Sequence, residues 1–255
     1  MPHQELPAGV RVALWGTAAL TGRLPLPDLP RRALPDIDEC LGLVETVRVW
    51  GELGERTVLV ALPRPGDVTG MPRGSADLVA HATRSEECVF VPALGGALVP
   101  DLEVFGPVGD QGWLSRWTRY DAEPVATHRL EALDLGHTEL ALRQQLAALT
   151  EELDRAGAPP FGDVAERGAA RARAAAGTAG LWGLPDGLPP RALRVLQLAG
   201  TVLAIADAGL DTATASVDAT SVTRRGTVLR QLQSTAARAL ADATNAAALH
   251  LAYRS

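Results

Sequence analysis

A loop with two arginines and three evenly spaced glycines holds the residues best suited to chemistry in this sequence. It runs from Pro63 to Ser75, and its glycines recur every four residues. Backbone N–H groups in such a loop can surround an anion, and the positive end of a helix that begins after Ser75 would strengthen the attraction. The pattern therefore suggests a site for a small anion. Its candidate residues are Arg64, Gly70, Arg73, Gly74 and Ser75.

The same loop also has a simpler interpretation. Its glycine spacing matches neither the dinucleotide-binding pattern nor the P-loop, and glycine and proline punctuate ordinary turns. A structural turn is therefore the competing hypothesis for Pro63–Ser75.

A second group of charged residues comes from two predicted strands, 113–120 and 125–130. If these strands form a hairpin, Arg116 lies opposite Arg129, and like charges directly opposite each other destabilise a sheet. A carboxylate such as Glu131, or a bound anion, would relieve the repulsion. The patch of Arg116, Arg129 and Glu131 is thus a second candidate binding site, unless the register slips by one residue.

No residue is predicted to be catalytic. All 24 basic residues are arginine, and the absence of lysine excludes the P-loop lysine, Schiff-base chemistry and a Ser–Lys dyad. Ser115 lies in no nucleophile elbow. The predicted hairpin places His128 beside Trp117 on an apolar face, which favours a core histidine over a general base.

No metal or other cofactor is predicted either. His81, Cys40 and Cys88 share no ligand spacing that binds metals, and a fourth ligand is missing. Two cysteines are too few for a disulfide framework, and they suit a reducing compartment.

Composition and charge narrow the class of protein. Hydrophobic residues make up 47% of the chain and charged residues 21%, as in soluble globular proteins. Residues 1–133 contain 12 arginines against 18 acidic residues, and residues 134–255 contain 12 of each. Neither part is basic, so we expect no nucleic-acid partner. The arginine-rich, lysine-free composition indicates a bacterial genome of high GC content.

Two apolar segments deserve comparison with membrane spans. Residues 12–20 are too few for a span and lack the basic start of a signal peptide. Residues 192–210 are interrupted by Arg194, Gln197 and Asp207. We therefore expect a cytoplasmic protein that does not contact a membrane.

The elements that must position these residues change in character near residue 133. Gly95-Gly96 lies between two apolar runs, which predicts a hairpin with a two-residue turn. The alternation of elements predicts an α+β fold, with a mainly antiparallel or mixed five-stranded sheet and flanking helices. The predicted helices span 9–21, 36–54 and 76–83, and the predicted strands span 56–62, 88–94, 97–100, 113–120 and 125–130.

A C-terminal helical bundle is predicted to follow the sheet. Leucines at 142, 146, 149 and 153 step by four, three and four residues, which is typical of an amphipathic helix. Residues 191–208 are apolar on nearly all sides and should form the buried central helix. The predicted helices of the bundle span 138–156, 164–176, 191–208 and 222–252. We predict a sheet domain over 1–133 and a bundle domain over 134–255, which can also pack as a single unit.

Two functional hypotheses remain. The first is a non-catalytic protein that acts through a protein partner or a small ligand. The second is an enzyme or sensor for an anionic metabolite that uses the Pro63–Ser75 loop. The sequence contains no indication of the oligomeric state.

Overall fold

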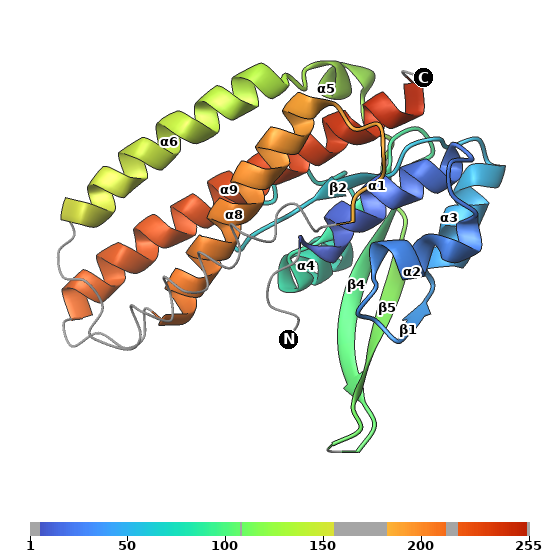
Figure 1. Ribbon diagram of the computed structural model, residues 1–255, viewed down its shortest axis with the longest axis horizontal. Helices are drawn as coiled ribbons and strands as arrows, with labels where there is room; N and C mark the ends of the chain where they lie inside the picture. The colour runs from blue at the N-terminus through green and yellow to red at the C-terminus, as the bar shows by residue number, and fades with distance from the viewer. Residues whose placement is uncertain (1–5, 108, 156–182, 213–218, 254–255) are drawn as a thin grey trace.

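The computed structural model describes residues 6–107, 109–155, 183–212 and 219–253 (Figure 1). It contains a five-stranded sheet with flanking helices, followed by long helices, so the predicted α+β class is confirmed. The strands are β1 (Glu39–Leu41), β2 (Leu59–Ala61), β3 (Cys88–Val91), β4 (Gly96–Phe105) and β5 (Gly112–Tyr120). The helices are α1 (Ala8–Leu20), η1 (Leu26–Asp28), α2 (Leu29–Ala33), α3 (Leu43–Glu52), α4 (Ala76–Ser85), α5 (Thr127–Glu131), α6 (Leu135–Arg155), α8 (Pro190–Thr212) and α9 (Ala219–Tyr253).

The sheet is mixed, with the strand order β1-β5-β4-β3-β2. β1 runs parallel to β5, and every other neighbouring pair is antiparallel. Successive residues of a strand point to opposite faces. A Cβ atom on Gly96 of β4 would lie against Trp50 of α3, whereas Tyr120, which pairs with the next residue, Ala97, contacts His81 of α4. α3 and α4 therefore cover opposite faces of the sheet.

One predicted strand is wrong. Residues 125–130 do not continue the meander, because this segment contains the short helix α5. β5 pairs with β4 on one side, and on the other side β1 occupies Leu114–Arg116, where part of the predicted strand would have paired. The fifth strand is instead β1, which lies within the helix predicted over 36–54. Only α3 of that segment is helical.

The predicted hairpin of β3 and β4 is present, but its turn is longer than expected. Val91 pairs with Gly96, so Pro92–Gly95 form a four-residue turn instead of a two-residue Gly95-Gly96 turn. Gly95 adopts a φ of +73°, and a Cβ atom there would lie 2.2 Å from the carbonyl oxygen of Ala122. Glycine is therefore required at this position for both backbone conformation and space.

A single side chain closes the outer edge of β2. Val60 N donates to Asn245 Oδ1 (2.8 Å), and Asn245 Nδ2 donates to Val60 O (2.9 Å). Asn245 lies on α9, and both residues are buried. The amide thus pairs with the strand as a further strand would, and it is the only asparagine in the chain.

A buried carboxylate joins the start of α1 to the sheet. Ala8 N donates to Glu87 Oε1 (3.2 Å), and Gly9 N donates to Glu87 Oε2. These N–H groups belong to the first turn of α1, where they have no partner within the helix. Burial raises the pKa of Glu87, while the N–H groups of Gly9 and Ala8 and the charge of Arg64 oppose that rise.

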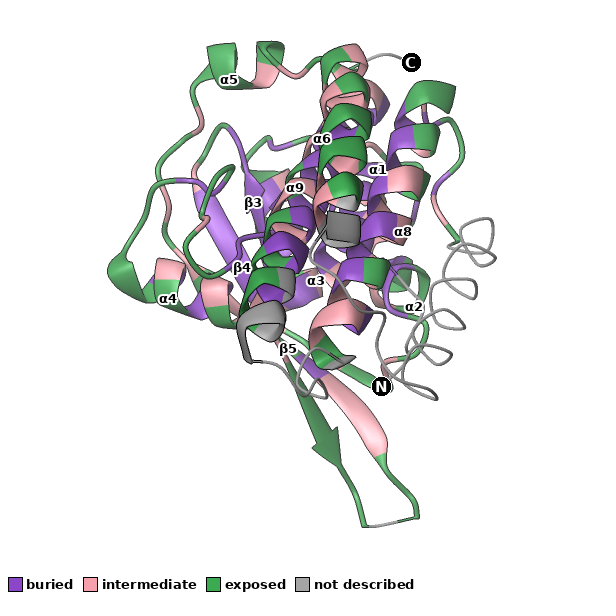
Figure 2. Cartoon of the chain, turned by 90° about the vertical axis from the view of Figure 1, so that its left-hand side faces the viewer, coloured by how far each residue is buried: buried purple, intermediate pink, exposed green. Residues whose placement is uncertain are grey.

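α9 connects the sheet to the other long helices. It packs against α8, α6, α1 and β2, and one buried hydrophobic cluster runs from the sheet through α1 and α9 to α8 (Figures 1 and 2). Small residues such as Ala236, Ala243 and Ala247 are buried on α9, as the alanine-rich sequence predicts. The helix predicted over 164–176 lies outside the described residues. The division into domains at residue 133 stays a prediction.

α8 has the length and composition of a membrane span over Pro190–Asp211. The central helix of a water-soluble protein passes the same test. Ala192, Leu196 and Ala199 are fully buried, and α8 packs extensively against α9. The cytoplasmic location and the absence of membrane contact stay predictions.

Candidate functional site

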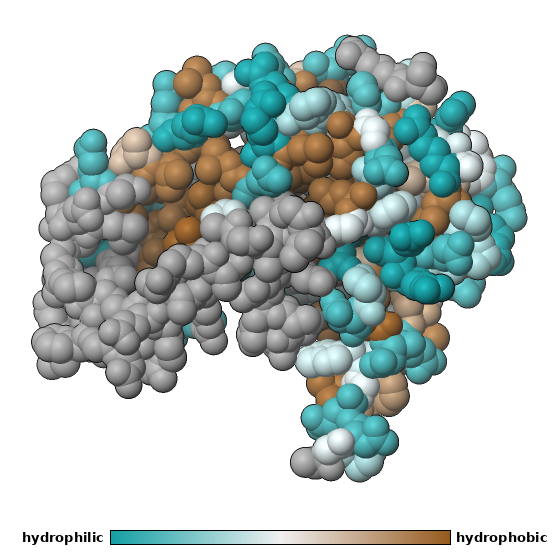
Figure 3. Space-filling model, in the orientation of Figure 1, coloured by the Kyte–Doolittle hydropathy of each residue, from teal (hydrophilic) through white to brown (hydrophobic). Residues whose placement is uncertain are grey.

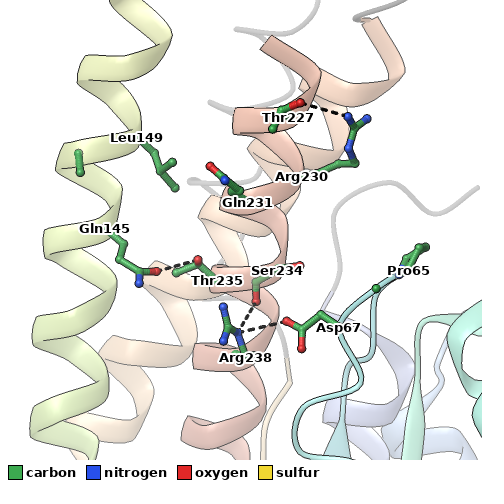
Figure 4. Close-up of a pocket in the computed structure, with 12 residues that line it drawn as sticks. Pro65, Asp67, Gln145, Leu149, Thr227, Arg230, Gln231, Ser234, Thr235 and Arg238 are labelled. Carbon is green, nitrogen blue, oxygen red and sulfur yellow. Dashed lines mark hydrogen bonds and ion pairs between the residues drawn. The ribbon is translucent and has the colours of Figure 1, made fainter. Parts of the chain in front are cut away.

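A groove of about 720 Å³ opens between α6, α9 and the turn Pro65–Asp67 (Figure 4). This volume lies within the range of about 300–1,000 Å³ that is typical of small-molecule sites. The turn and the two helices come from segments far apart in the chain. Apolar contacts are offered by Pro65, Ala148 and Leu149, and polar groups by Asp67, Gln145, Thr227, Arg230, Gln231, Ser234, Thr235 and Arg238.

The turn has a fixed shape because its two ends pair with each other. Arg64 N donates to Asp67 O and Asp67 N donates to Arg64 O, each at 2.8 Å. Pro65 and Gly66 occupy the central positions, and Gly66 has a φ of +84°. Proline followed by a glycine with positive φ is typical of a type II turn. The local sequence therefore determines how Asp67 is presented to α9.

Asp67 ties this turn to α9. Its Oδ2 atom lies 3.3 Å from Arg238 Nε, and its Oδ1 atom accepts from Thr69 N (3.1 Å). Burial raises the pKa of Asp67, but the hydrogen bonds from Thr69 and the charge of Arg238 outweigh burial and leave the pKa below its usual value. Asp67 is thus held ionised as the counter-charge of Arg238.

Arg230 is different, because it has no acidic partner among the residues that the structure describes. Its Nη2 atom makes one long contact, 3.5 Å, with Thr227 Oγ1 one turn earlier on α9. The side chain is exposed at the groove. The groove therefore contains two guanidinium groups, Arg230 and Arg238, against one carboxylate, Asp67.

A smaller hollow of about 190 Å³ adjoins the groove and extends it along α6 and α9. Thr235 Oγ1 donates to Gln145 Oε1 (2.8 Å), and both residues line the two hollows. Asp242 and His137 lie at the far end. Burial raises the pKa of Asp242, and the charge of Arg238 partly offsets this.

The structure separates the residues of the predicted anion loop. Arg64 is buried, and its Nη1 atom donates to Pro63 O and Glu86 O and lies 3.5 Å from Glu86 Oε2. Arg73 is exposed, and its carbonyl group accepts from Glu123 N. One guanidinium group is therefore buried and the other is exposed to solvent.

The helix start in that loop is formed as the sequence predicts. Ser75 precedes α4, and its Oγ atom accepts from Leu78 N (3.1 Å), so it is the expected N-cap. Gly74 forms a bridge with Ala122, and Gly70 has a φ of +89°. Both glycines therefore have structural reasons to be present, and anion binding by this loop stays a prediction.

The predicted pairing of Arg116 with Arg129 is wrong. Arg116 lies opposite Asp101 of β4, and its Nε atom is 3.4 Å from Glu103 Oε1. Arg129 and Glu131 lie on α5, where both are exposed. The repulsion that suggested an anion therefore does not arise.

The expected core histidine is also wrong. His128 is exposed on α5, because the predicted strand that placed it in the core is absent. The buried histidine is His81, which lies between Tyr120 Oη (2.8 Å from Nδ1) and Asp101 Oδ1 (2.9 Å from Nε2). This network joins α4 to β4 and β5. Across the described part of the chain, no three metal-binding side chains cluster.

Two half-buried carboxylates, Asp207 of α8 and Glu86 after α4, lie near the buried guanidinium of Arg64. Burial raises the pKa of Asp207, while the hydrogen bond from Gln233 Nε2 (2.7 Å) and the charge of Arg64 oppose the rise. Burial likewise raises the pKa of Glu86. A raised pKa means that the folded state binds this proton more tightly than the unfolded state, so ionisation opposes folding.

We therefore expect Asp207→Asn to raise the melting temperature near about pH 8, because an amide oxygen can still accept from Gln233 without a buried charge. The gain should shrink as the pH falls toward about 4, where the unfolded state also takes up the proton. Thermal unfolding across this range measures it, with the fully exposed Asp121→Asn as control. A melting temperature for Asp207→Asn below that of the wild type at the higher pH would contradict this expectation.

Sequence reasoning missed the groove because its residues converge only after packing. Arg230 and Arg238 are eight residues apart within a long helical pattern, where charged residues normally indicate a solvated face. The turn with Asp67 precedes them by more than 160 residues. Of the features that form the groove, only the turn signal Pro65-Gly66 can be recognised from neighbouring residues in the sequence.

Comparison with known proteins gives two adjoining matches. Residues 9–133 match the N-terminal domain of Rv1486c-like protein, and residues 126–241 match its C-terminal domain. No curated protein and no solved structure matches the chain. Because the two domain matches together span most of the sequence in the expected order, this chain belongs to the Rv1486c-like protein family.

Proposed function

We propose that this protein binds a small anionic ligand in the groove between α6, α9 and the turn Pro65–Asp67. The supporting observation is Arg230, an exposed guanidinium at a groove of small-molecule size without an acidic partner among the described residues. A planar guanidinium can form two parallel hydrogen bonds with a carboxylate or phosphate. The amide groups of Gln145 and Gln231 and the hydroxyl of Ser234 add further hydrogen-bonding capacity around it.

A binding role is proposed in preference to a catalytic one. The hydroxyl groups that line the groove belong to Thr227, Ser234 and Thr235. Nucleophilic catalysis needs such a group beside a base. In the described part of the chain, Thr235 contacts Gln145 and Thr227 contacts Arg230, neither of which can act as that base at neutral pH.

Isothermal titration with phosphate, pyrophosphate, citrate and AMP tests the proposal. We expect at least one of these anions to bind, and Arg230→Ala to weaken that binding by at least about tenfold, or 1.4 kcal/mol. Arg119→Ala is the control, since Arg119 is exposed on β5 and does not line the groove. Unchanged binding by Arg230→Ala would contradict the proposed site.

The same titration separates the groove from the loop that the sequence suggested. If Arg73→Ala weakens binding and Arg230→Ala does not, the anion binds at the start of α4 instead. Thermal unfolding with saturating ligand gives a second measure, because a ligand at 100 times its Kd stabilises the folded state by about 2.7 kcal/mol.

A further inference from the structure

A two-stranded arm projects from the body of the protein. We define the arm as residues 101–107 and 109–116, the outer ends of β4 and β5 with their connecting turn (Figures 1 and 2). β5 is covered along its outer edge by β1, and Asp38 extends that contact by accepting from Trp113 N. The two strands of the arm therefore differ in how their edges are protected.

The outer edge of β4 is open along the arm. β3 pairs with β4 only at Gly96–Leu98, and α4 reaches the strand next, through His81 and Asp101. The last four residues of β4, Leu102–Phe105, are all exposed. Natural proteins protect such edges with charged side chains, proline, bulges or very short strands. β4 has ten residues, and its open part, Leu102–Phe105, contains one charged residue, Glu103, and no proline.

Large apolar side chains flank this open edge. Leu102 is 52% exposed, Val104 48% and Phe105 44%. Leu102 and Val104 point to one face of the arm and Phe105 to the other, because side chains alternate along a strand. Figure 3 shows apolar and polar surface side by side along the arm. An open edge with apolar side chains on both faces can bind an added strand.

The charges of the arm favour a basic strand. The arm carries Asp101, Glu103 and Asp110 against the single Arg116, and Asp38 and Glu39 stand beside it on the β1 side. Two copies of β4 paired with each other would bring carboxylates of Asp101 and Glu103 close together, which destabilises a sheet.

The pairing of β4 with β5 shows which side chains can lie opposite the residues of β4. Across β5, Arg116 lies opposite Asp101 and reaches Glu103, while Trp113 lies opposite Val104. A second strand that places an arginine opposite Asp101 and an aromatic residue opposite Val104 would meet the same side chains from the outer edge. Opposite charges and apolar pairs across strands each stabilise the pairing.

We infer that the outer edge of β4 is a docking site for an extended segment of a protein partner in which basic and apolar residues alternate. The segment adds to the sheet as a sixth strand beside Leu102–Phe105. Its basic residues lie opposite Asp101 and Glu103, and its apolar residues cover Leu102 and Val104. This inference does not depend on the proposed anion groove, which lies between α6 and α9.

The test uses the full protein and a synthetic eight-residue peptide in which arginine and valine alternate, blocked at both ends and labelled for fluorescence anisotropy. We expect saturable binding with a Kd below about 100 µM, the range of a weak interface. A peptide in which every arginine is replaced by glutamate should bind at least about tenfold more weakly, and higher salt should weaken the binding of the arginine peptide. Equal binding of the two peptides, or no binding, overturns the inference.

Two variants locate the binding edge. Leu102→Ser and Glu103→Arg should each weaken peptide binding by at least about tenfold, since they remove an apolar contact and a counter-charge. Both side chains are more than half exposed, and thermal unfolding checks that the variants fold. Glu52→Arg on α3 is the control, because it makes the same charge change on an exposed residue outside the arm. Binding that survives both arm variants overturns the inference.

Sedimentation of the protein without peptide tests whether a second copy of the chain occupies the β4 edge instead. A monomer is expected. A dimer that Leu102→Ser dissociates would show that a second copy occupies the edge, and this would overturn the proposal of a basic partner.

Discussion

Replacing Asn245 with leucine is expected to destabilise the protein by about 4 kcal/mol, because two buried backbone groups lose their partner. Val60 N–H and Val60 C=O both bond to the Asn245 amide, and the Val60 side chain is fully buried. In the register of β2 with β3, Val60 lies opposite Val89, and its hydrogen-bonding groups turn toward α9. Leucine can neither accept nor donate there, and water has no access.

Urea unfolding of Asn245→Leu measures the loss, with the exposed Gln231→Leu on the same helix as control. Asn245→Asp adds a pH signature. An ionised carboxylate would place an oxygen against Val60 O, whereas a protonated carboxyl group can donate to it. The destabilisation by Asn245→Asp should therefore decrease as the pH falls. A urea midpoint for Asn245→Leu equal to that of the wild type would show that the bonds to β2 do not hold α9 in place.

Leu196→Ala is expected to cost about 2–5 kcal/mol from lost burial and the cavity left behind. Leu196 is fully buried in α8, within the cluster that continues through α9 to the sheet. Leu140→Ala on α6 is the control, because that side chain is 55% exposed and should change stability by less than about 0.5 kcal/mol. A change of that small size for Leu196→Ala would show that α8 is peripheral.

The same variant also tests the predicted division at residue 133. In a Trp182→Phe background, all four remaining tryptophans lie within residues 1–133. If the two parts unfold as one unit, Leu196→Ala should shift the tryptophan transition as much as the helical transition measured by circular dichroism. A tryptophan transition that does not move would indicate two independently folding domains.

Local sequence predicted those elements whose signals lie within the element itself. β3 is a continuous apolar run, Ser75 has the side chain of an N-cap, and Leu142 belongs to an amphipathic repeat that the structure buries. The signals for these elements, an apolar run, a capping side chain and a helical repeat, each lie within a short stretch of sequence. Prediction from local pattern therefore succeeded for them.

β1 and α5 show where local pattern fails. The three residues of β1 carry no strand periodicity, and their conformation comes from parallel pairing with β5 more than 70 residues later. Residues 125–130 resemble a strand, yet β4 pairs with one side of β5 and β1 occupies part of the other side, at Leu114–Arg116. Whether a segment forms a strand at these positions depends on which edge of β5 is free to pair with it. A short stretch of sequence does not contain that information.

The candidate groove was hidden for a related reason, although one residue offered a signal. Arg230 and Arg238 gain their meaning from α6 and from the turn at Asp67, which pack beside them only in the folded chain. Asn245 could have been noticed, since a lone asparagine in an alanine-rich buried seam needs a hydrogen-bonding partner. It would have indicated that α9 meets unpaired polar groups, such as the backbone N–H and C=O groups that the edge strand of a sheet presents.

The bond between Asn245 and Val60 also has a consequence for how the protein is made. The two residues are 185 positions apart, so a ribosome that adds about 5–20 residues per second needs roughly 10–40 s to progress from one to the other. Throughout that interval the nascent sheet presents the apolar strand β2 with its outer edge unpaired. Chaperone binding to the growing chain should therefore be strongest between the emergence of β2 and that of α9, and chains that stop short of Asn245 should aggregate.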